Sequence, residues 1–170
     1  VLFLVAGTVA SWPFWSLPQP TVSITRPAPL PAQDRPALEA GVAVRDITPP
    51  IGLPKFGYSA LAHDADGFRT RLKARVFCLK PARGAPVALV QADLGASSLL
   101  LHHRVAELVA AKTDVPAQNL AILATHTHSG PGQYLESDFY NAFGANRPGF
   151  DPQLFAFLSS RMADAVIEAC

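Results

Sequence analysis

The sequence has little charge and no strong excess of either sign. Only 16% of its 170 residues are charged, and 14 Lys and Arg against 13 Asp and Glu give a formal net charge of +1. A nucleic-acid-binding protein is therefore excluded as the main interpretation, because no cationic excess is available to neutralise phosphates. A disordered chain is excluded as well, since 49% of the residues are hydrophobic and the net charge is close to zero.

Cysteine is also scarce, with only Cys78 and Cys170 in the whole chain. Two thiols are too few for a disulfide framework or for a cysteine-rich zinc site. Cys78 stands in an apolar run, so we predict a buried thiol at this position. The length of the chain suits one domain or part of a larger one.

The first 17 residues contain no charged side chain, and the first one to appear is Arg26. This run is shorter than the roughly 20 apolar residues of a membrane span, and Pro13 interrupts it. We interpret residues 1–17 as a secretory signal or an N-terminal membrane anchor, with a buried core helix as the alternative. Because a positive leader and an initiator Met are both missing, we expect the printed sequence to begin within such a leader.

Proline is abundant, and its positions predict a linker. Seven of the 16 prolines lie within the 24 residues from Pro13 to Pro36. Proline fixes φ and removes a backbone donor, so we predict that residues 18–37 form an extended, solvated linker. An apolar leader followed by a stiff linker indicates a domain that is secreted or anchored to the membrane on the extracytoplasmic side.

From residue 38 onward, strand and helix patterns alternate. Period-two alternation and short apolar runs predict strands over 41–46, 68–79, 87–92 and 119–124. Apolar stripes next to capping residues predict helices over 98–112 and 152–168. The connection of about 25 residues between the last two strands predicts that they pair in parallel. We therefore expect an α/β domain with a mixed, partly parallel sheet and flanking helices.

Charged side chains near the first two predicted strands have a structural and a functional interpretation. The alternation over 68–79 places four cations on one strand face: Arg69, Arg71, Lys73 and Arg75. This face either attracts an anionic headgroup or is a solvated face of the sheet. Asp46, just before Thr48-Pro49-Pro50, is expected to shape an Asx-type turn rather than to take part in catalysis.

Two histidines follow the last predicted strand directly, in Thr125-His126-Thr127-His128. Residues two apart in an extended chain point to the same side, so His126 and His128 are expected to face one pocket. That pocket lies at the carboxyl end of a strand, where α/β sheets usually bind ligands. Two imidazoles are a start for a zinc site, which still needs a third protein ligand and a position for water. Ordinary hydrogen-bonded histidines are the alternative.

Residues around these histidines complete the predicted site. The glycines of the next turn allow backbone amides to approach a bound group, so Ser129 and Gly130 are predicted to line a substrate pocket. Asp93 ends the neighbouring parallel strand, where its carboxylate either orients a ligand histidine or caps the following turn. Of the remaining histidines, His102 and His103 are expected to be structural, and His63 is expected to be solvated.

Six motifs follow one another along the chain. They are Gly41-Val42, Asp46-Ile47-Thr48-Pro49-Pro50-Ile51-Gly52-Leu53-Pro54, Gly57-Tyr58, Arg71-Leu72-x-Ala74-Arg75, Ala92-Asp93-Leu94-Gly95 and Ala124-Thr125-His126-Thr127-His128-Ser129-Gly130-Pro131-Gly132. Their order and spacing resemble those of neutral ceramidases, the neutral/alkaline non-lysosomal ceramide amidases. The resemblance covers about residues 40 to 168, and the His-Thr-His-Ser-Gly-Pro block is its most distinctive part.

The resemblance implies a zinc-dependent hydrolase that cleaves the amide of ceramide, or of a similar lipid amide at a membrane surface, into a sphingoid base and a fatty acid. It implies that His126 binds zinc and that His128 is a catalytic residue lining the reaction site. Zinc would lower the pKa of bound water and polarise the amide carbonyl. The resemblance also implies a calcium or magnesium ion held partly by the backbone carbonyl of Arg69, after Gly67-Phe68.

The family's catalytic domain is far longer than this chain. The resemblance therefore implies that residues 38–170 are the N-terminal portion of such a domain, inactive alone. The other zinc ligands (a second His, a Glu and a Tyr) and the catalytic serine are expected in the missing C-terminal part. Two alternatives stay open: a related metallo-hydrolase with another amide or ester substrate, and a membrane-anchored lipid-binding domain that has lost catalysis.

Overall fold

The computed structural model describes residues 38–170, with the exception of residue 146. Four strands form one sheet, in the order β1 (Leu38–Asp46), β2 (Lys73–Pro81), β3 (Val87–Ala92) and β4 (Leu120–Ala124). β1, β2 and β3 pair antiparallel, whereas β3 and β4 pair parallel. The predicted mixed, partly parallel sheet with flanking helices is therefore confirmed.

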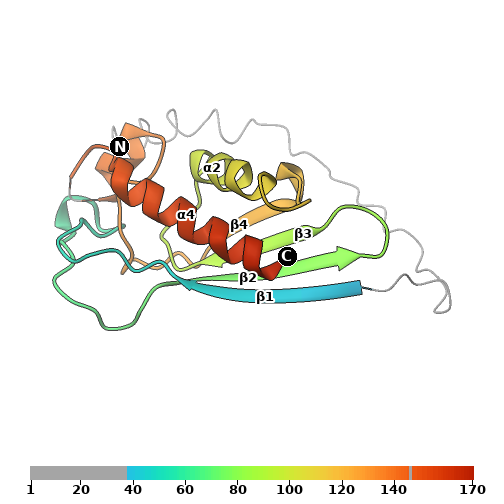
Figure 1. Cartoon of the computed structure of the whole chain (residues 1–170). Coiled ribbons are helices and arrows are strands. Elements are labelled where there is room, and N and C mark those ends of the chain that lie inside the picture. Colours follow the sequence, from blue (N-terminus) through green and yellow to red (C-terminus); the bar gives the residue numbers. More distant parts are fainter. Residues whose placement is uncertain (1–37, 146) are drawn as a thin grey trace, which may run out of the picture. The chain divides into compact units, whose positions relative to one another are not determined.

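Two long helices lie on one face of this sheet (Figure 1). α2 (Leu99–Ala110) connects β3 to β4, and α4 (Pro152–Ala169) ends the chain. α4 packs on β1, β2 and α2, while α2 lies beside β4. The connection through α2 returns the chain to the end of the sheet where β3 begins. β4 therefore runs in the same direction as β3.

Both long helices begin at side chains that satisfy free backbone donors. The side chain of Ser98 accepts a hydrogen bond from the amide of Leu101, at 3.0 Å. Asp151 accepts from the amides of Gln153 and Leu154, and Pro152 occupies the first turn, where no donor is needed. These caps explain why the predicted helix starts agree with the structure to within a residue.

The hydrophobic core lies between the helices and the face of the sheet that they cover. On that face the strands contribute mainly small side chains: Ala43, Ala74, Val76, Ala88, Val90, Ala92 and Ile122. The helices contribute larger ones, including Leu101, Val105, Leu158 and Met162. Small side chains on the strands allow the helices to approach the sheet closely. The larger helix side chains then pack between the strand side chains and fill the core.

Cys78 is not a free thiol, and the prediction of a buried thiol is wrong. It forms a disulfide with Cys170, which is 92 residues later in the sequence, and their Cα atoms are 5.3 Å apart. The two residues meet because α4 runs back across β1 and β2. Gly41 permits this approach, since a Cβ at Gly41 would overlap the backbone carbonyl of Ala169.

Other elements also differ from their predictions, and β1 begins at Leu38 rather than at Gly41. The strand predicted over 68–79 begins only at Lys73, and the residues before it are irregular. The polar region after the second histidine contains a short helix, α3 (Asp138–Gly144), and another short helical turn, η2 (Ser59–Leu61), lies beside it. These short elements and loops surround the carboxyl end of β4.

The predictions for residues 1–17 and 18–37 lie outside the described residues. Within the described part of the chain, no helix has both the length and the apolar composition needed to cross a membrane.

Candidate active site

His126 and His128 lie together just beyond the end of β4. Their ring centroids are 5.1 Å apart, and the ring planes meet at 71°. The extended geometry that was expected to align them is absent, because β4 ends at Ala124 and His126 has a φ of 60°. A left-handed turn therefore brings the two rings together, and such backbone is uncommon for a residue other than glycine.

The ring of His126 is fixed by a backbone carbonyl. Its Nδ1 lies 2.6 Å from the carbonyl oxygen of Gly95. A carbonyl oxygen only accepts hydrogen bonds, so Nδ1 carries a proton, and in the neutral imidazole Nε2 then keeps a lone pair. Histidines that bind metals commonly donate their second ring nitrogen to a carbonyl or a carboxylate in this way. His126 as a whole is an exposed residue.

Aromatic rings from the loop before η2 contact the rings of the two histidines edge-on. Phe56 meets His126 and His128 edge-on, with centroid distances of 6.4 Å and 6.2 Å. Tyr58 makes a similar contact with His128 at 5.0 Å. Between them, Gly57 has a φ of 81°, and a Cβ there would lie inside the ring of His128. The position of His128 therefore depends on glycine at residue 57.

Tyr134 supports the segment that carries the carbonyl of Gly95. Its hydroxyl donates to the carbonyl of Ala96 at 2.5 Å and accepts from the amide of Ala96 at 3.1 Å. Burial raises the pKa of Tyr134 to about 12, although its hydrogen bond to Ala96 acts in the opposite direction. The hydroxyl therefore stays protonated and remains a donor at physiological pH.

Asp93 has partners other than those expected for a residue that orients a ligand histidine. Its carboxylate accepts hydrogen bonds from the amide of Lys73 at 2.9 Å and from the guanidinium of Arg75 at 3.0 Å. The position beside His126 is taken by the Gly95 carbonyl instead. Asp93 thus joins the start of β2 to the loop after β3. This role is closer to the predicted alternative, capping of the following turn, than to orienting a ligand histidine.

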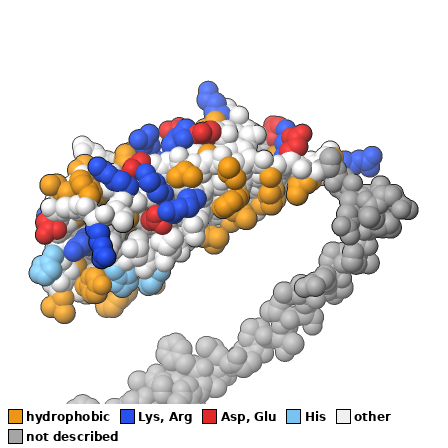
Figure 2. Space-filling view, turned by 90° about the horizontal axis from the view of Figure 1, so that it is seen from below, with side chains coloured by type: hydrophobic (Ala, Val, Ile, Leu, Met, Phe, Trp, Pro, Cys, Tyr) orange, Lys and Arg blue, Asp and Glu red, His pale blue; other side chains and the backbone are white. Residues whose placement is uncertain are grey.

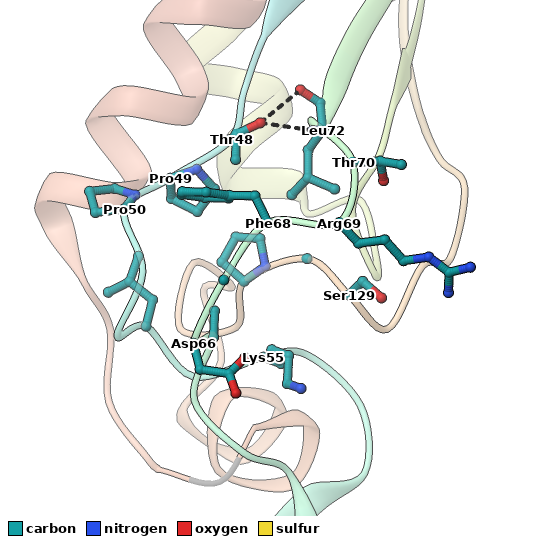
Figure 3. Close-up of a pocket in the computed structure, with 15 residues that line it drawn as sticks. Thr48, Pro49, Pro50, Lys55, Asp66, Phe68, Arg69, Thr70, Leu72 and Ser129 are labelled. Carbon is teal, nitrogen blue, oxygen red and sulfur yellow. Dashed lines mark hydrogen bonds between the residues drawn. The ribbon is translucent and has the colours of Figure 1, made fainter.

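Three of the predicted site residues line a cavity of about 190 Å³ next to the histidine turn. They are Arg69, Ser129 and Gly130, whereas His126 and His128 are not part of the lining. Figure 3 shows apolar walls at Pro49, Pro50, Phe68 and Leu72, hydroxyls at Thr48, Thr70 and Ser129, and charges at Lys55, Asp66 and Arg69. Ligand pockets usually measure about 300 Å³ or more, so this cavity suits a small group rather than a whole lipid.

The described residues supply only part of a metal site. Among residues 38–145 and 147–170, no group of three His, Cys, Asp or Glu side chains is placed to hold a metal ion. The chemistry at His126 fits one zinc ligand, and a catalytic zinc needs about two further protein ligands. The calcium or magnesium site at the carbonyl of Arg69 stays a prediction.

Asp46 and His102 have structural roles. Asp46 accepts a hydrogen bond from the amide of Thr48 at 2.8 Å, which confirms the predicted Asx-type turn. Hydrogen bonds from Lys73 and from Thr48 hold the pKa of Asp46 well below its usual range. The Nε2 of His102 lies 3.0 Å from the carbonyl of Leu120 and so joins α2 to β4. The other two histidines outside the site, His63 and His103, are exposed.

Several residues that shape the site were not identified from the sequence. Gly95 belongs to a motif already noted, Ala92-Asp93-Leu94-Gly95, but nothing in that motif shows that its carbonyl receives a histidine. Phe56 and Tyr134 carry no local pattern at all. Phe56 fills a space bounded by Gly95 and Gly144, where a Cβ would overlap its ring. Such a slot is visible only when loops distant in sequence are placed together.

Comparison with known proteins assigns the chain to a family. A sequence model of the neutral/alkaline non-lysosomal ceramidase N-terminal region matches residues 38–170. Neutral ceramidase of Drosophila pseudoobscura pseudoobscura is 33% identical over 124 residues, which is 71% of this chain and 17% of that protein. Neutral ceramidase 3 of Arabidopsis thaliana is 32% identical over 132 residues, which is 76% of this chain and 18% of that protein.

A solved structure shares the fold. The crystal structure of neutral ceramidase from Pseudomonas aeruginosa has a TM-score of 0.71 and 30% sequence identity, and the match covers 80% of this chain and 22% of that one. This chain therefore spans less than a quarter of the proteins that it resembles. With the family match over residues 38–170, we conclude that the chain belongs to the neutral/alkaline non-lysosomal ceramidase family and corresponds to its N-terminal region.

Proposed function

We propose that this chain is the N-terminal portion of a zinc-dependent amidase that hydrolyses ceramide to a sphingoid base and a fatty acid. The observation that carries the proposal is the hydrogen bond from His126 Nδ1 to the Gly95 carbonyl, which leaves Nε2 free beside the ring of His128. Family membership supports the substrate class, and the chemistry of the histidine pair supports the metal.

His126 is the residue of this chain that would hold zinc. When bound there, zinc would supply Lewis-acid polarisation of the amide carbonyl and would lower the pKa of water. The remaining ligands would come from parts of the protein outside the described residues. The Gly95 carbonyl and, behind it, Tyr134 keep the imidazole oriented, which reduces the cost of organising the site.

His128 is the residue of this chain that would take part in proton transfer. Hydrolysis breaks the amide C–N bond, adds the oxygen of water to the acyl carbon and delivers a proton to the leaving amine. Imidazole is the side chain most often used for such transfers. Phe56, Gly57 and Tyr58 fix the ring of His128 5.1 Å from that of His126, within reach of the same bound group.

An exposed aromatic cluster supports a lipid substrate met at a membrane surface. In α3, Phe139 is 67% exposed, Tyr140 is 59% exposed and Phe143 is 65% exposed. α3 packs beside η2, where Leu61 is exposed as well. Exposed apolar patches mark sites of interaction, and aromatic side chains suit the boundary between water and lipid. We therefore propose that α3 makes the membrane contact.

The disulfide supports the proposed location of the protein. Disulfides form and persist in oxidising compartments and are rare in the reducing cytosol. The Cys78–Cys170 pair therefore favours a protein that is secreted or anchored on the extracytoplasmic side. The apolar residues 1–17 would provide the signal or the anchor.

The catalytic proposal is tested on the longer gene product. Ceramide hydrolysis is measured with and without a chelator, and then with His126→Ala. We expect either treatment to reduce hydrolysis by at least about a hundredfold, and added zinc to restore the chelated enzyme. His103→Ala is the matched control, because this exposed histidine on α2 lies outside the site. Full activity after chelation or in His126→Ala would remove the zinc mechanism.

Substrate profiling separates ceramide from other amides and esters. The same enzyme preparation is offered ceramides, short acyl amides and acyl esters. Preference for ceramide supports the proposal, whereas faster cleavage of short acyl amides or esters would assign the site to a related metallo-hydrolase. Absence of any hydrolysis together with retained vesicle binding would favour a lipid-binding domain that has lost catalysis.

A further inference from the structure

The face of the sheet opposite α2 and α4 carries many apolar side chains and is uncovered in the described part of the chain. Six large apolar side chains on it are between 36% and 68% exposed: Val42, Val44, Phe77, Val87, Leu89 and Leu123. We call these six residues the open face. Figure 2 looks onto the molecule from this side and shows hydrophobic side chains gathered along the strands.

The open face is continuous because the strand register places its side chains in rows. Val42 of β1 lies opposite Phe77 of β2, which lies opposite Leu89 of β3. Leu79 and Val87 form part of the neighbouring row. An antiparallel sheet whose second face meets water normally carries polar side chains on that face. The rows through Phe77 and Val87 are apolar and have the composition of a buried surface, whereas the row of Val44 and Leu123 also contains Arg75 and Gln91.

The cations that border the open face do not favour a membrane as its partner. Lys73 forms an ion pair with Asp46 at 2.8 Å, and Arg75 forms one with Asp93 at 3.0 Å. Anionic lipid surfaces attract clusters of cations that are available to their headgroups. Lys73 and Arg75 are each already paired with a carboxylate, so these two strand cations are not free to bind lipid headgroups.

The family comparison favours another layer of the same domain. The match to the Pseudomonas aeruginosa ceramidase uses 80% of this chain but only 22% of that one. Most of the solved chain therefore lies outside the matched segment. β3 and β4 form a parallel pair, and parallel strands are typically covered on both faces. A pleated face rich in Val and Leu can accept a second layer at about 10 Å.

We propose that the open face is an internal packing surface of the complete ceramidase domain. Its partner is a second apolar layer, contributed by the part of the domain that the matched segment does not include. This inference goes beyond the catalytic proposal. It rests on the sheet and on family membership, and it does not depend on zinc.

Labelling of a single introduced cysteine tests the proposal. Val42→Cys is placed in the 170-residue chain and in the longer gene product. The two native cysteines of this chain are joined in a disulfide and do not compete. Glu107→Cys on α2 is the matched control, because the Glu107 side chain is 69% exposed. Maleimide is added under native conditions, and the rate is read by mass spectrometry of the peptide that contains the introduced cysteine.

We expect Val42→Cys to react at least about tenfold more slowly in the longer product than in the 170-residue chain, since labelling of a covered site requires local opening. Glu107→Cys is expected to react at similar rates in both. Leu123→Cys, at a residue that is 56% exposed, gives the same measurement if Val42→Cys does not fold.

Three results would overturn the proposal. Equally fast labelling of Val42→Cys in both proteins would show that nothing covers the open face. Slow labelling in the 170-residue chain that becomes faster on dilution would assign the face to a second copy. Slow labelling that is relieved by deleting residues 1–37 would assign it to the N-terminal segment. Retained ceramide hydrolysis in His126→Ala, which would overturn the zinc mechanism, leaves these labelling rates unaffected, so the two proposals fail separately.

Discussion

At the scale of single residues, the environment of His126 depends on a short chain of contacts. Tyr134 holds both backbone groups of Ala96, and the adjacent carbonyl of Gly95 receives the Nδ1 proton of His126. None of these contacts involves a charged group. The orientation of the imidazole is therefore set by backbone geometry, which is less sensitive to salt than an ion pair would be.

Tyr134→Phe tests this support. The variant leaves the amide and carbonyl of Ala96 without their partner, so we expect the free energy of unfolding to fall by about 1–2 kcal/mol. Urea unfolding of the 170-residue chain at pH 8 measures this change. Tyr134→Leu, which also removes the ring, is expected to cost more because it leaves a cavity. Equal stability of wild type and Tyr134→Phe would show that the hydroxyl contributes nothing.

Tyr134→Phe is also expected to change how the stability of the protein depends on alkaline pH. The pKa of Tyr134 is raised from 10.0 to about 12, so the unfolded chain loses the phenol proton at lower pH than the folded protein. The corresponding stability is fully present below about pH 10 and is lost as pH rises towards about 12. We expect this loss in wild type and not in Tyr134→Phe, as measured by urea midpoints at pH 9 and pH 11. Parallel declines in both proteins would contradict the assignment.

At this scale, the sequence predicted which side chains lie in the site, but it did not predict their hydrogen-bond partners. His126 and His128 follow a recognisable strand, so their proximity was predictable, and Asp46 takes the turn that its neighbours favour. The partner of His126 was not predictable, because hydrogen bonds to backbone carbonyls leave no trace in residue type. Asp93 illustrates the difficulty, since a carboxylate at that position suits a histidine or an arginine equally well.

At the scale of elements, the strongest periodicities gave the correct structures. β3 has the predicted limits, and α2 and α4 lie within two residues of theirs. β2 was predicted too long because alternation continues through residues 68–72, where the chain instead lines the cavity. α3 was missed because a helix of seven residues has too few turns to show a stripe.

Gly41→Ala tests the contact between β1 and α4. The new methyl group would overlap the carbonyl of Ala169, which is backbone and cannot rotate away. We expect the free energy of unfolding to fall by about 1–3 kcal/mol, the usual cost of overpacking. Gly67→Ala is the control, since a Cβ at Gly67 meets nothing within 4 Å. Equal urea midpoints for the two variants would show that α4 can shift without cost.

The double variant Phe139→Ser/Phe143→Ser tests the proposed membrane contact of α3. Both rings are more than half exposed, so the fold is expected to remain stable. In the longer gene product we expect binding to phosphatidylcholine vesicles that contain ceramide to weaken by about tenfold or more, because apolar area no longer enters the lipid. Hydrolysis of a water-soluble short acyl amide serves as the control and is expected to change little. Unchanged vesicle binding would place the membrane contact elsewhere.

At the scale of the whole molecule, one covalent link crosses the sheet and helix layers. The Cys78–Cys170 disulfide joins β2 to the residue after α4. The sequence contained both cysteines but not their pairing, because a separation of 92 residues carries no information about distance in space. The family's order of motifs was recognisable in the sequence, and it indicated a partial domain. The apolar side chains left without cover agree with that interpretation.

Cys170→Ser tests the contribution of the disulfide. Closing a long loop restricts the unfolded chain, so we expect the variant to lose about 2–4 kcal/mol in the free energy of unfolding. Reductant should lower the urea midpoint of wild type by a similar amount and should leave Cys170→Ser unchanged. A reductant effect of equal size on both proteins would show that the disulfide is not the source of stability.

The disulfide also determines how the chain behaves after proteolytic cleavage. The hairpin between β2 and β3 is exposed around Arg83, and it lies between the two bonded cysteines. A protease that cuts after Arg83 therefore produces two fragments that stay covalently attached, and gel electrophoresis without reductant would show them migrating as one species. A cleaved preparation of this protein would therefore look intact on a non-reducing gel, and a thiol reductant would be needed to separate the two fragments.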